Sequence, residues 1–199
     1  YLTDGNTRSG IQVFKDHLIL ETQIATDMDN TELDTADANG DADHLFSVTA
    51  GTLSVENGIE LYVVNDYTPG GNVDVGTGGI KILGSWTATG TETINLEGGW
   101  ELSGGSFTIA SSTVIFDGSG AASIVGNTVT FYNLTIDDSG GSKSVTISIN
   151  VTINNDLVLD TNSTLNGASG RKVTIQGDFA WQGTYATITD HTIEFTGGS

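Results

Sequence analysis

The sequence predicts an all-β protein, and three observations support that prediction. Its composition is rich in Thr, Ser, Val and Ile and includes 27 glycines but one proline, which is typical of short strands joined by glycine turns. From Leu45 onward, apolar and polar residues alternate, with Gly, Asn or Asp interrupting every few positions. A unit of strand, glycine and aromatic residue also recurs three times. We therefore expect one elongated β domain.

The chain divides into two parts by composition. Residues 1–45 hold a strand-like stretch around Val13 to Leu20, and then a run from Thr26 to Asp43 that contains seven acids and no base. Such a run cannot fold through apolar burial alone. We assign 1–45 as an N-terminal strand with an acidic loop, an arm for assembly, and 46–199 as the repeat-containing β domain.

The clearest alternation lies near the middle of the β domain. A period of two places five apolar residues on one face, as a half-buried strand or a bent pair of strands. These residues are Val145, Ile147, Ile149, Val151 and Ile153.

The internal repeat reads I-x-I-x-G-x-W-x-x-x-G in its first copy. Glycine relieves close backbone approach at a corner, and the aromatic residue after it fills volume between layers. We therefore expect Trp86, Trp100, Phe179 and Trp181 to pack in the core, with a sugar-stacking platform as the alternative. The three copies are Ile80, Ile82, Gly84, Trp86 and Gly90; Ile94, Leu96, Gly98, Trp100 and Gly104; and Val173, Ile175, Gly177, Phe179 and Gly183.

These units, together with the segment from Ser112 to Ile136, resemble the Gly/Thr/Asn-rich repeats of secreted bacterial and archaeal surface proteins. Adhesin passenger domains of the filamentous haemagglutinin and autotransporter type belong to that group. The resemblance implies a parallel β-helix, here with an N-terminal extension strand. Strand spacing from Val114 to Val129 to Val145, and from Val173 to Ile193, fits coils of roughly 15 to 20 residues. A β-sandwich or jelly roll, built from hairpins, is the alternative.

Charge and composition limit the function classes. Six Lys and Arg against 25 Asp and Glu give a net charge of −19, which repels phosphate backbones and anionic lipid. We expect no nucleic-acid partner and no membrane insertion. The absence of cysteine excludes disulfides and thiolate metal sites. The first residue is Tyr1 rather than Met, as expected if a secretion leader has been removed.

The acidic run contains a candidate cation site. Oxygen ligands at every second residue around a glycine turn are typical of a calcium loop, because a hard cation needs many oxygens within a small radius. The ligands would be Asp37, Asn39, Asp41 and Asp43. The glycine lies one place early and the twelfth-position Glu of an EF-hand is missing, so a solvated, self-repelling loop is the alternative.

Three sequons predict N-glycosylation, at Asn133, Asn150 and Asn162. The parity of the neighbouring apolar residues leaves Asn133 and Asn150 pointing outward, where a glycan fits.

Catalytic motifs are lacking. His17, His44 and His191 lie far apart, and no nucleophile elbow, zincin or nucleotide-binding motif occurs. After position 15 the bases are Lys81, Lys143, Arg171 and Lys172, so a polysaccharide lyase would have few candidates for its base. We predict no enzyme activity. The least favoured alternative is a polysaccharide-degrading β-helix enzyme, either a lyase or a hydrolase that uses two carboxylates facing across a groove.

The predicted function is that of a self-assembling extracellular subunit of a filament, pilus-like fibre or surface layer, whose main partner is another copy of the chain. The final repeat runs to its end without a blunting helix or charged strand, and open β edges are adhesive. Residues 10–20 could add a strand to a neighbour or serve as an ordinary first strand. The alternative is an adhesin or carbohydrate-binding module for cell-surface glycans.

Overall fold

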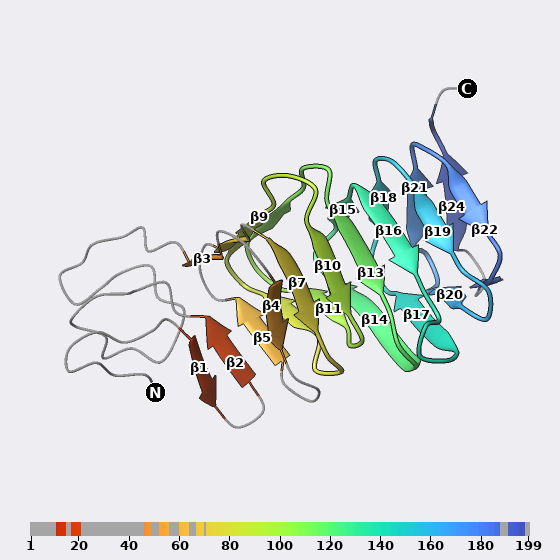
Figure 1. Ribbon diagram of the computed structural model, residues 1–199. Coiled ribbons are helices and arrows are strands. Elements are labelled where there is room, and N and C mark those ends of the chain that lie inside the picture. The colour runs from red at the N-terminus through yellow and green to blue at the C-terminus, as the bar shows by residue number, and fades with distance from the viewer. Residues whose placement is uncertain are drawn as a thin grey trace, which may run out of the picture.

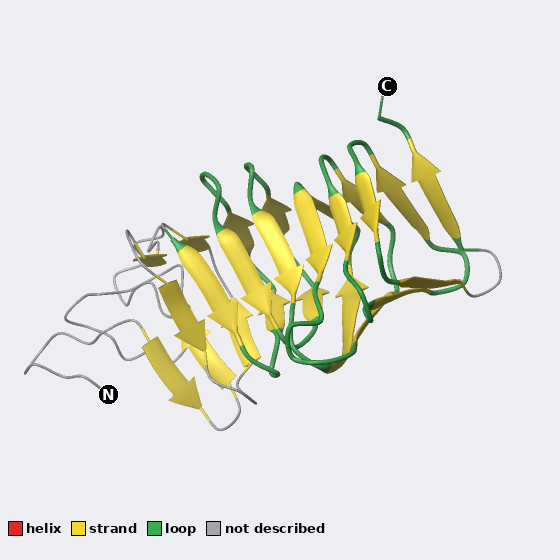
Figure 2. Ribbon diagram, turned by 45° about the vertical axis from the view of Figure 1, so that its right-hand side comes forward, coloured by secondary structure: helices red, strands yellow, loops and turns green. Residues whose placement is uncertain are grey.

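The computed structural model describes residues 11–14, 17–20, 46–48, 52–55, 60–63, 67–69, 71–187 and 191–197. Within these ranges the chain forms strands and loops and no helix, as Figure 2 shows. The all-β prediction is confirmed. The described part therefore also holds no helix that is long and apolar enough to cross a membrane.

The strands wind into a parallel β-solenoid with three sides, which confirms the β-helix and removes the sandwich alternative (Figure 1). Each coil contributes one strand to each side, and among the described strands every pairing is parallel except that of the first hairpin. One side is a nine-stranded sheet, one a seven-stranded sheet, and the third is divided into an N-terminal and a C-terminal four-stranded sheet.

The nine-stranded sheet contains β1 Ile11–Phe14, β2 His17–Leu20, β5 Glu60–Val63, β8 Ile80–Ile82, β11 Trp100–Leu102, β14 Gly120–Gly126, β17 Lys143–Ile147, β20 Thr164–Gly167 and β23 Thr184–Thr187. The seven-stranded sheet contains β4 Thr52–Val55, β7 Asn72–Val75, β10 Thr93–Leu96, β13 Thr113–Phe116, β16 Asn133–Ile136, β19 Leu157–Leu159 and β22 Phe179–Trp181.

The N-terminal four-stranded sheet contains β3 Phe46–Val48, β6 Tyr67–Pro69, β9 Ser85–Thr87 and β12 Ser106–Thr108. The C-terminal four-stranded sheet contains β15 Val129–Phe131, β18 Val151–Ile153, β21 Lys172–Ile175 and β24 Thr192–Phe195.

Coil lengths lie at or above the upper end of the roughly 15 to 20 residues that the sequence spacing predicted. Leu61 lies in register with Ile80, nineteen residues later, and Trp100 with Ile124, twenty-four residues later. The predicted pairing of Val173 with Ile193 is confirmed. The predicted spacing from Val114 to Val129 to Val145 is wrong as a coil period, because those residues belong to three different sheets.

The three copies of the repeat also lie on three different sides. They begin in β8, β10 and β21, and each contains a strand, a corner and the start of the next strand. The repeat is thus a corner unit rather than a coil. Its glycine is required by close packing: a Cβ on Gly98 would come within 2.4 Å of the Gly79 nitrogen, and one on Gly177 within 2.3 Å of the Asn155 oxygen.

Apolar and polar residues alternate along the strands, so that the apolar side chains point into the interior. The five residues from Val145 to Ile153 are all buried, split between β17 and β18 by a bend, so the predicted bent pair is confirmed. Trp86 and Trp100 are fully buried, and the ring of Phe107 in β12 lies 5.9 Å from that of Phe131 in β15 across the division of the third side. Trp181, however, is 59% exposed, so the core prediction is wrong for that residue.

The N-terminal hairpin starts the nine-stranded sheet. β1 pairs antiparallel with β2, and β2 pairs parallel with β5. The sequence left two roles open for this segment, an ordinary first strand or a strand donated to a neighbour. In this structure β1 and β2 have the first of these roles. The rest of the predicted segment 1–45 lies outside the described residues.

Candidate functional site

A shallow hollow lies on the outer face of the nine-stranded sheet. Four buried residues lie in register on neighbouring strands: Leu61, Ile80, Trp100 and Ile124. Because side chains alternate along a strand, the residues that precede these four form one row that points outward. That row runs from Glu60 through two glycines to Ser123. Because glycine has no side chain, the row is interrupted over β8 and β11. The two glycines are Gly79 and Gly99.

Close approach of the backbones requires these glycines. Gly79 has a φ of +78°, and a Cβ there would come within 2.4 Å of the Gly99 oxygen. A Cβ on Gly99 would lie 3.1 Å from the Ser123 oxygen. The hollow is therefore a consequence of how tightly these corners stack, and side chains are excluded from its centre.

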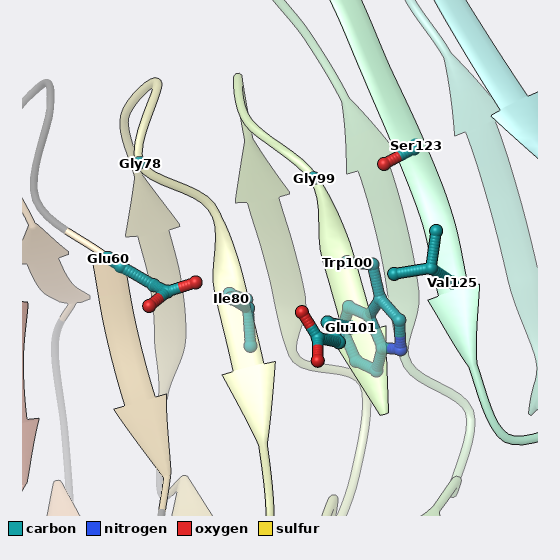
Figure 3. Close-up of a pocket in the computed structure, with 8 residues that line it drawn as sticks. All are labelled: Glu60, Gly78, Ile80, Gly99, Trp100, Glu101, Ser123 and Val125. Carbon is teal, nitrogen blue, oxygen red and sulfur yellow. The ribbon is translucent and has the colours of Figure 1, made fainter. Parts of the chain in front are cut away.

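We call this feature the glycine hollow. Its volume is about 180 Å³, and Figure 3 shows the carboxylates of Glu60 and Glu101 pointing toward one another across β8. Ile80 and Trp100 have side chains that point into the core beneath it. The lining residues are Glu60, Gly78, Ile80, Gly99, Trp100, Glu101, Ser123 and Val125.

Neighbouring side chains hold Glu101 in place. The Ser103 hydroxyl donates a hydrogen bond to its carboxylate, and the Lys81 ammonium lies 3.0 Å from the same Oε1 oxygen. These interactions, that of Ser103 first, lower the pKa of Glu101 below its ordinary value. Glu101 is therefore an ionised hydrogen-bond acceptor with a fixed orientation at the rim of the hollow.

A second unusual feature is the buried base Lys143. Its side chain is fully buried, and its ammonium donates a hydrogen bond to the backbone oxygen of Glu97. Burial lowers the pKa of Lys143, while the charges of Glu97 and Asp117 act in the opposite direction. The enclosed ammonium thus supports the corner between the seven- and nine-stranded sheets and does not face solvent.

The same corner carries a group of acids farther along the solenoid. Carboxylate oxygens of Asp137, Asp138 and Asp160 lie within 4.8 Å of one another, and the Asn162 amide donates to Asp138 over 2.9 Å. Oxygen ligands of this kind suit a hard cation. Sequence reasoning missed this group because its members come from successive coils whose length was not known.

The predicted calcium ligands Asp37, Asn39, Asp41 and Asp43 lie outside the described residues. Of the three histidines, the structure describes only the side chain of His191. Its Nδ1 lies 3.2 Å from the Ala168 oxygen.

The three sequon asparagines differ in their surroundings. Asn133 is half-buried, and its amide donates to the Thr113 hydroxyl at 3.1 Å and accepts from Asn155 at 2.8 Å. Asn150 is exposed, and its oxygen accepts from the Lys172 backbone at 3.0 Å. Asn162 is exposed, has a φ of +61° and donates to Asp138.

The last described coil presents aromatic residues to solvent. Phe179 and Trp181 stack with ring centroids 5.7 Å apart and planes at 13°, and the Phe195 ring lies 5.9 Å from that of Phe179. Both Trp181 and Phe195 are 59% exposed. We call these three residues the aromatic edge. Among the described strands, the three of this coil, β22, β23 and β24, each pair on one side only.

Comparison with protein families, with curated proteins and with solved structures finds no match to this chain. The functional inference therefore depends on the geometry of the residues described above.

Proposed function

We propose that this chain is a structural subunit of an extracellular filament, pilus-like fibre or surface layer, and that copies join end to end through strand edges. The observation that carries the proposal is the aromatic edge. Two large aromatic side chains, Trp181 and Phe195, are more than half exposed on a coil whose earlier equivalents are covered by the next coil. Exposed apolar surface of this kind marks a contact site.

The proposed occupant of the aromatic edge is the opposite end of a second copy. At that end β3 and β4 begin their sheets and, among the described strands, pair on one side only. The seven-stranded sheet would continue from β22 of one copy into β4 of the next, with the backbone pairing used inside the solenoid. Contact between unlike ends is heterologous, and because each copy would stack along the solenoid axis of the last, it extends into a filament rather than closing into a ring.

The extracellular location is supported by the repeats, which resemble those of secreted surface proteins. Exposed sequons at Asn150 and Asn162 are consistent with that location.

Electron microscopy and sedimentation of a double variant would test the assembly. Trp181→Ser with Phe195→Ser removes the exposed aromatic surface, so we expect dispersed monomers where the wild-type chain forms fibres. The control is Tyr132→Ser, since Tyr132 lies in the middle of the solenoid and is half-buried. The proposal fails if the double variant forms fibres like the wild type, or if the wild type stays monomeric at high concentration.

Calcium binding in the acidic loop remains part of the proposal. We expect titration calorimetry of the chain to show heat with calcium that Asp41→Ala reduces. Glu194→Gln, which changes an exposed acid paired with Lys172, is the control and should leave that heat unchanged, whereas Asp160→Ala would report calcium bound by the second acidic group. Absence of heat at millimolar calcium would contradict the loop site.

An adhesin or carbohydrate-binding function is the second candidate, and the glycine hollow favours it. We do not expect catalysis there. The lining holds two carboxylates and a hydroxyl, and the neighbouring base Lys81 is paired with Glu101. A polysaccharide lyase needs a base that is available to take a proton from the substrate. Release of reducing ends from a polysaccharide panel would contradict this expectation.

A further inference from the structure

We propose that the glycine hollow binds one uncharged pyranose ring of a glycan, with the ring lying flat over the glycine backbone and its hydroxyls bonded to the rim. The glycine hollow lies on the outer face of the nine-stranded sheet, whereas the proposed contact between copies pairs strand edges of the seven-stranded sheet, so the two sites can be tested separately.

The floor of the glycine hollow suits a flat ligand. Gly78 and Gly99 line it. Gly79, immediately before β8, also has no side chain, so the flat area continues there. Polypeptide backbone without side chains allows a ring to approach closely, as glycine does wherever a ligand contacts main chain. A volume of about 180 Å³ is below the usual range for drug-sized ligands, so it fits one ring rather than several.

The rim supplies the polar groups that a pyranose requires. Glu60 and Glu101 offer carboxylate acceptors on two sides of the hollow, and the Ser123 hydroxyl can donate or accept on the third. Ser103 and Lys81 already hold the Glu101 carboxylate, so it loses little freedom when a ligand binds. Vicinal hydroxyls around the edge of a ring match acceptors arranged in this way.

Charge restricts which sugars fit. Two carboxylates against Lys81 leave the rim negative, and the chain as a whole carries −19. An acidic sugar would meet like charges at the rim and across the surface, which opposes its binding. The site therefore selects neutral rings over uronic acids of the same size.

The test is a titration of the full chain followed by amide NMR, with methyl glucoside, methyl galactoside, N-acetylglucosamine and glucuronate as probes. We expect shift changes centred on Gly78, Gly99 and Ser123 with at least one neutral sugar, and none with glucuronate. Ser123→Leu places an apolar side chain at the hollow and should weaken binding by roughly tenfold or more.

The matched control is Thr146→Leu. Thr146 lies in register with Ser123 on the next strand, in the same outward row but beyond the lining of the hollow. It should leave binding unchanged. Glu101→Gln keeps the size of the side chain and should also weaken binding. This variant provides the test if Ser123→Leu alters the fold.

Three outcomes would overturn the proposal. One is that no neutral sugar shifts these amides. Another is that glucuronate binds as well as the neutral rings. The third is that methylammonium produces the shifts while the sugars do not, which would make the hollow a cation site.

Discussion

The ammonium of Lys143 donates a hydrogen bond to the backbone oxygen of Glu97, two coils earlier in the solenoid. The lysine side chain therefore runs along the interior and connects β17 to the corner that follows β10. A buried charge without compensation is costly, and here Glu97 and Asp117 supply the opposite charge.

Removing this side chain should destabilise the fold. Lys143→Ala leaves a void and an unpaired carbonyl, so we expect a loss of about 2–4 kcal/mol in urea denaturation. Lys143→Met restores most of the volume and should lose about 1 kcal/mol. Lys172→Met is the control: Lys172 is half exposed beside Glu194, and its loss should change stability by less than about 0.5 kcal/mol. Equal stability of Lys143→Ala and the wild type would refute a supporting role.

The same lysine should produce an alkaline pH dependence. Burial holds the pKa of Lys143 below its ordinary value of 10.5 in the folded protein. Between the folded-state pKa and 10.5 the unfolded chain binds more protons, so the contribution of Lys143 to stability becomes more favourable as pH rises through that window. Subtracting the profile of Lys143→Met from that of the wild type isolates this effect. A difference that is flat with pH would contradict it.

Glu92 should contribute in the acid range. Its carboxylate accepts hydrogen bonds from the Thr89 backbone at 2.9 Å, the Thr89 hydroxyl at 2.7 Å and the Gly90 backbone at 2.9 Å. Burial raises the pKa of Glu92, but these bonds outweigh it, and the pKa lies below the ordinary 4.5. The resulting stability is present above pH 4.5 and is lost as pH falls through the folded-state pKa.

Glu92→Gln tests this. We expect a loss of about 1–3 kcal/mol at neutral pH, because the amide cannot accept all three bonds. The difference from the wild type should shrink as the wild-type carboxylate becomes protonated. Exposed Glu194→Gln should show little difference at any pH. A Glu92→Gln penalty that is constant down to acid pH would mean that the charge plays no part.

Much of the fold was predictable because burial in a solenoid follows strand parity. Alternation alone identified Val145, Ile147 and Ile153 as core residues, and the repeat identified the corners after Ile82 and Leu96. Local sequence carries this information, since each strand and corner is a short unit.

Which residues lie next to one another on neighbouring strands was not predictable in the same way. Loops of different length at the corners change the coil period, so no single spacing aligns Glu60 with Gly79, or Gly99 with Ser123. The glycine hollow depends on that register and could not be found before the coils were aligned. The exposure of Trp181 was missed for a related reason: the repeat predicts an inward aromatic residue but does not say whether a following coil covers it.

The environments of the sequons predict an order of glycosylation. The Asn133 amide is engaged by Thr113 and Asn155, whereas Asn150 is exposed and uses only its oxygen in the hydrogen bonds of the described residues. Expressed in a glycosylating host, the chain should carry a glycan at Asn150 and none at Asn133, as measured by peptide mass spectrometry. Asn150→Gln should remove that mass. Modification of Asn133 ahead of Asn150 would contradict the order.

A pair of glycine variants separates backbone strain from steric contact at the hollow. Gly79 and Gly120 both have positive φ, of 78° and 88°. A Cβ on Gly79 would lie 2.4 Å from the Gly99 oxygen, whereas one on Gly120 meets no atom within 4 Å. Gly120→Ala therefore bears only the conformational cost, about 1–2 kcal/mol.

Gly79→Ala bears the same conformational cost and must also push β11 away, so its loss of stability in urea should exceed that of Gly120→Ala by about 2 kcal/mol or more. Movement of β11 would separate Gly99 from Gly79 and distort the floor of the glycine hollow, so sugar binding should weaken in Gly79→Ala and not in Gly120→Ala. Equal stability of the two variants would show that the corners tolerate a wider spacing, and that close stacking does not set the shape of the hollow.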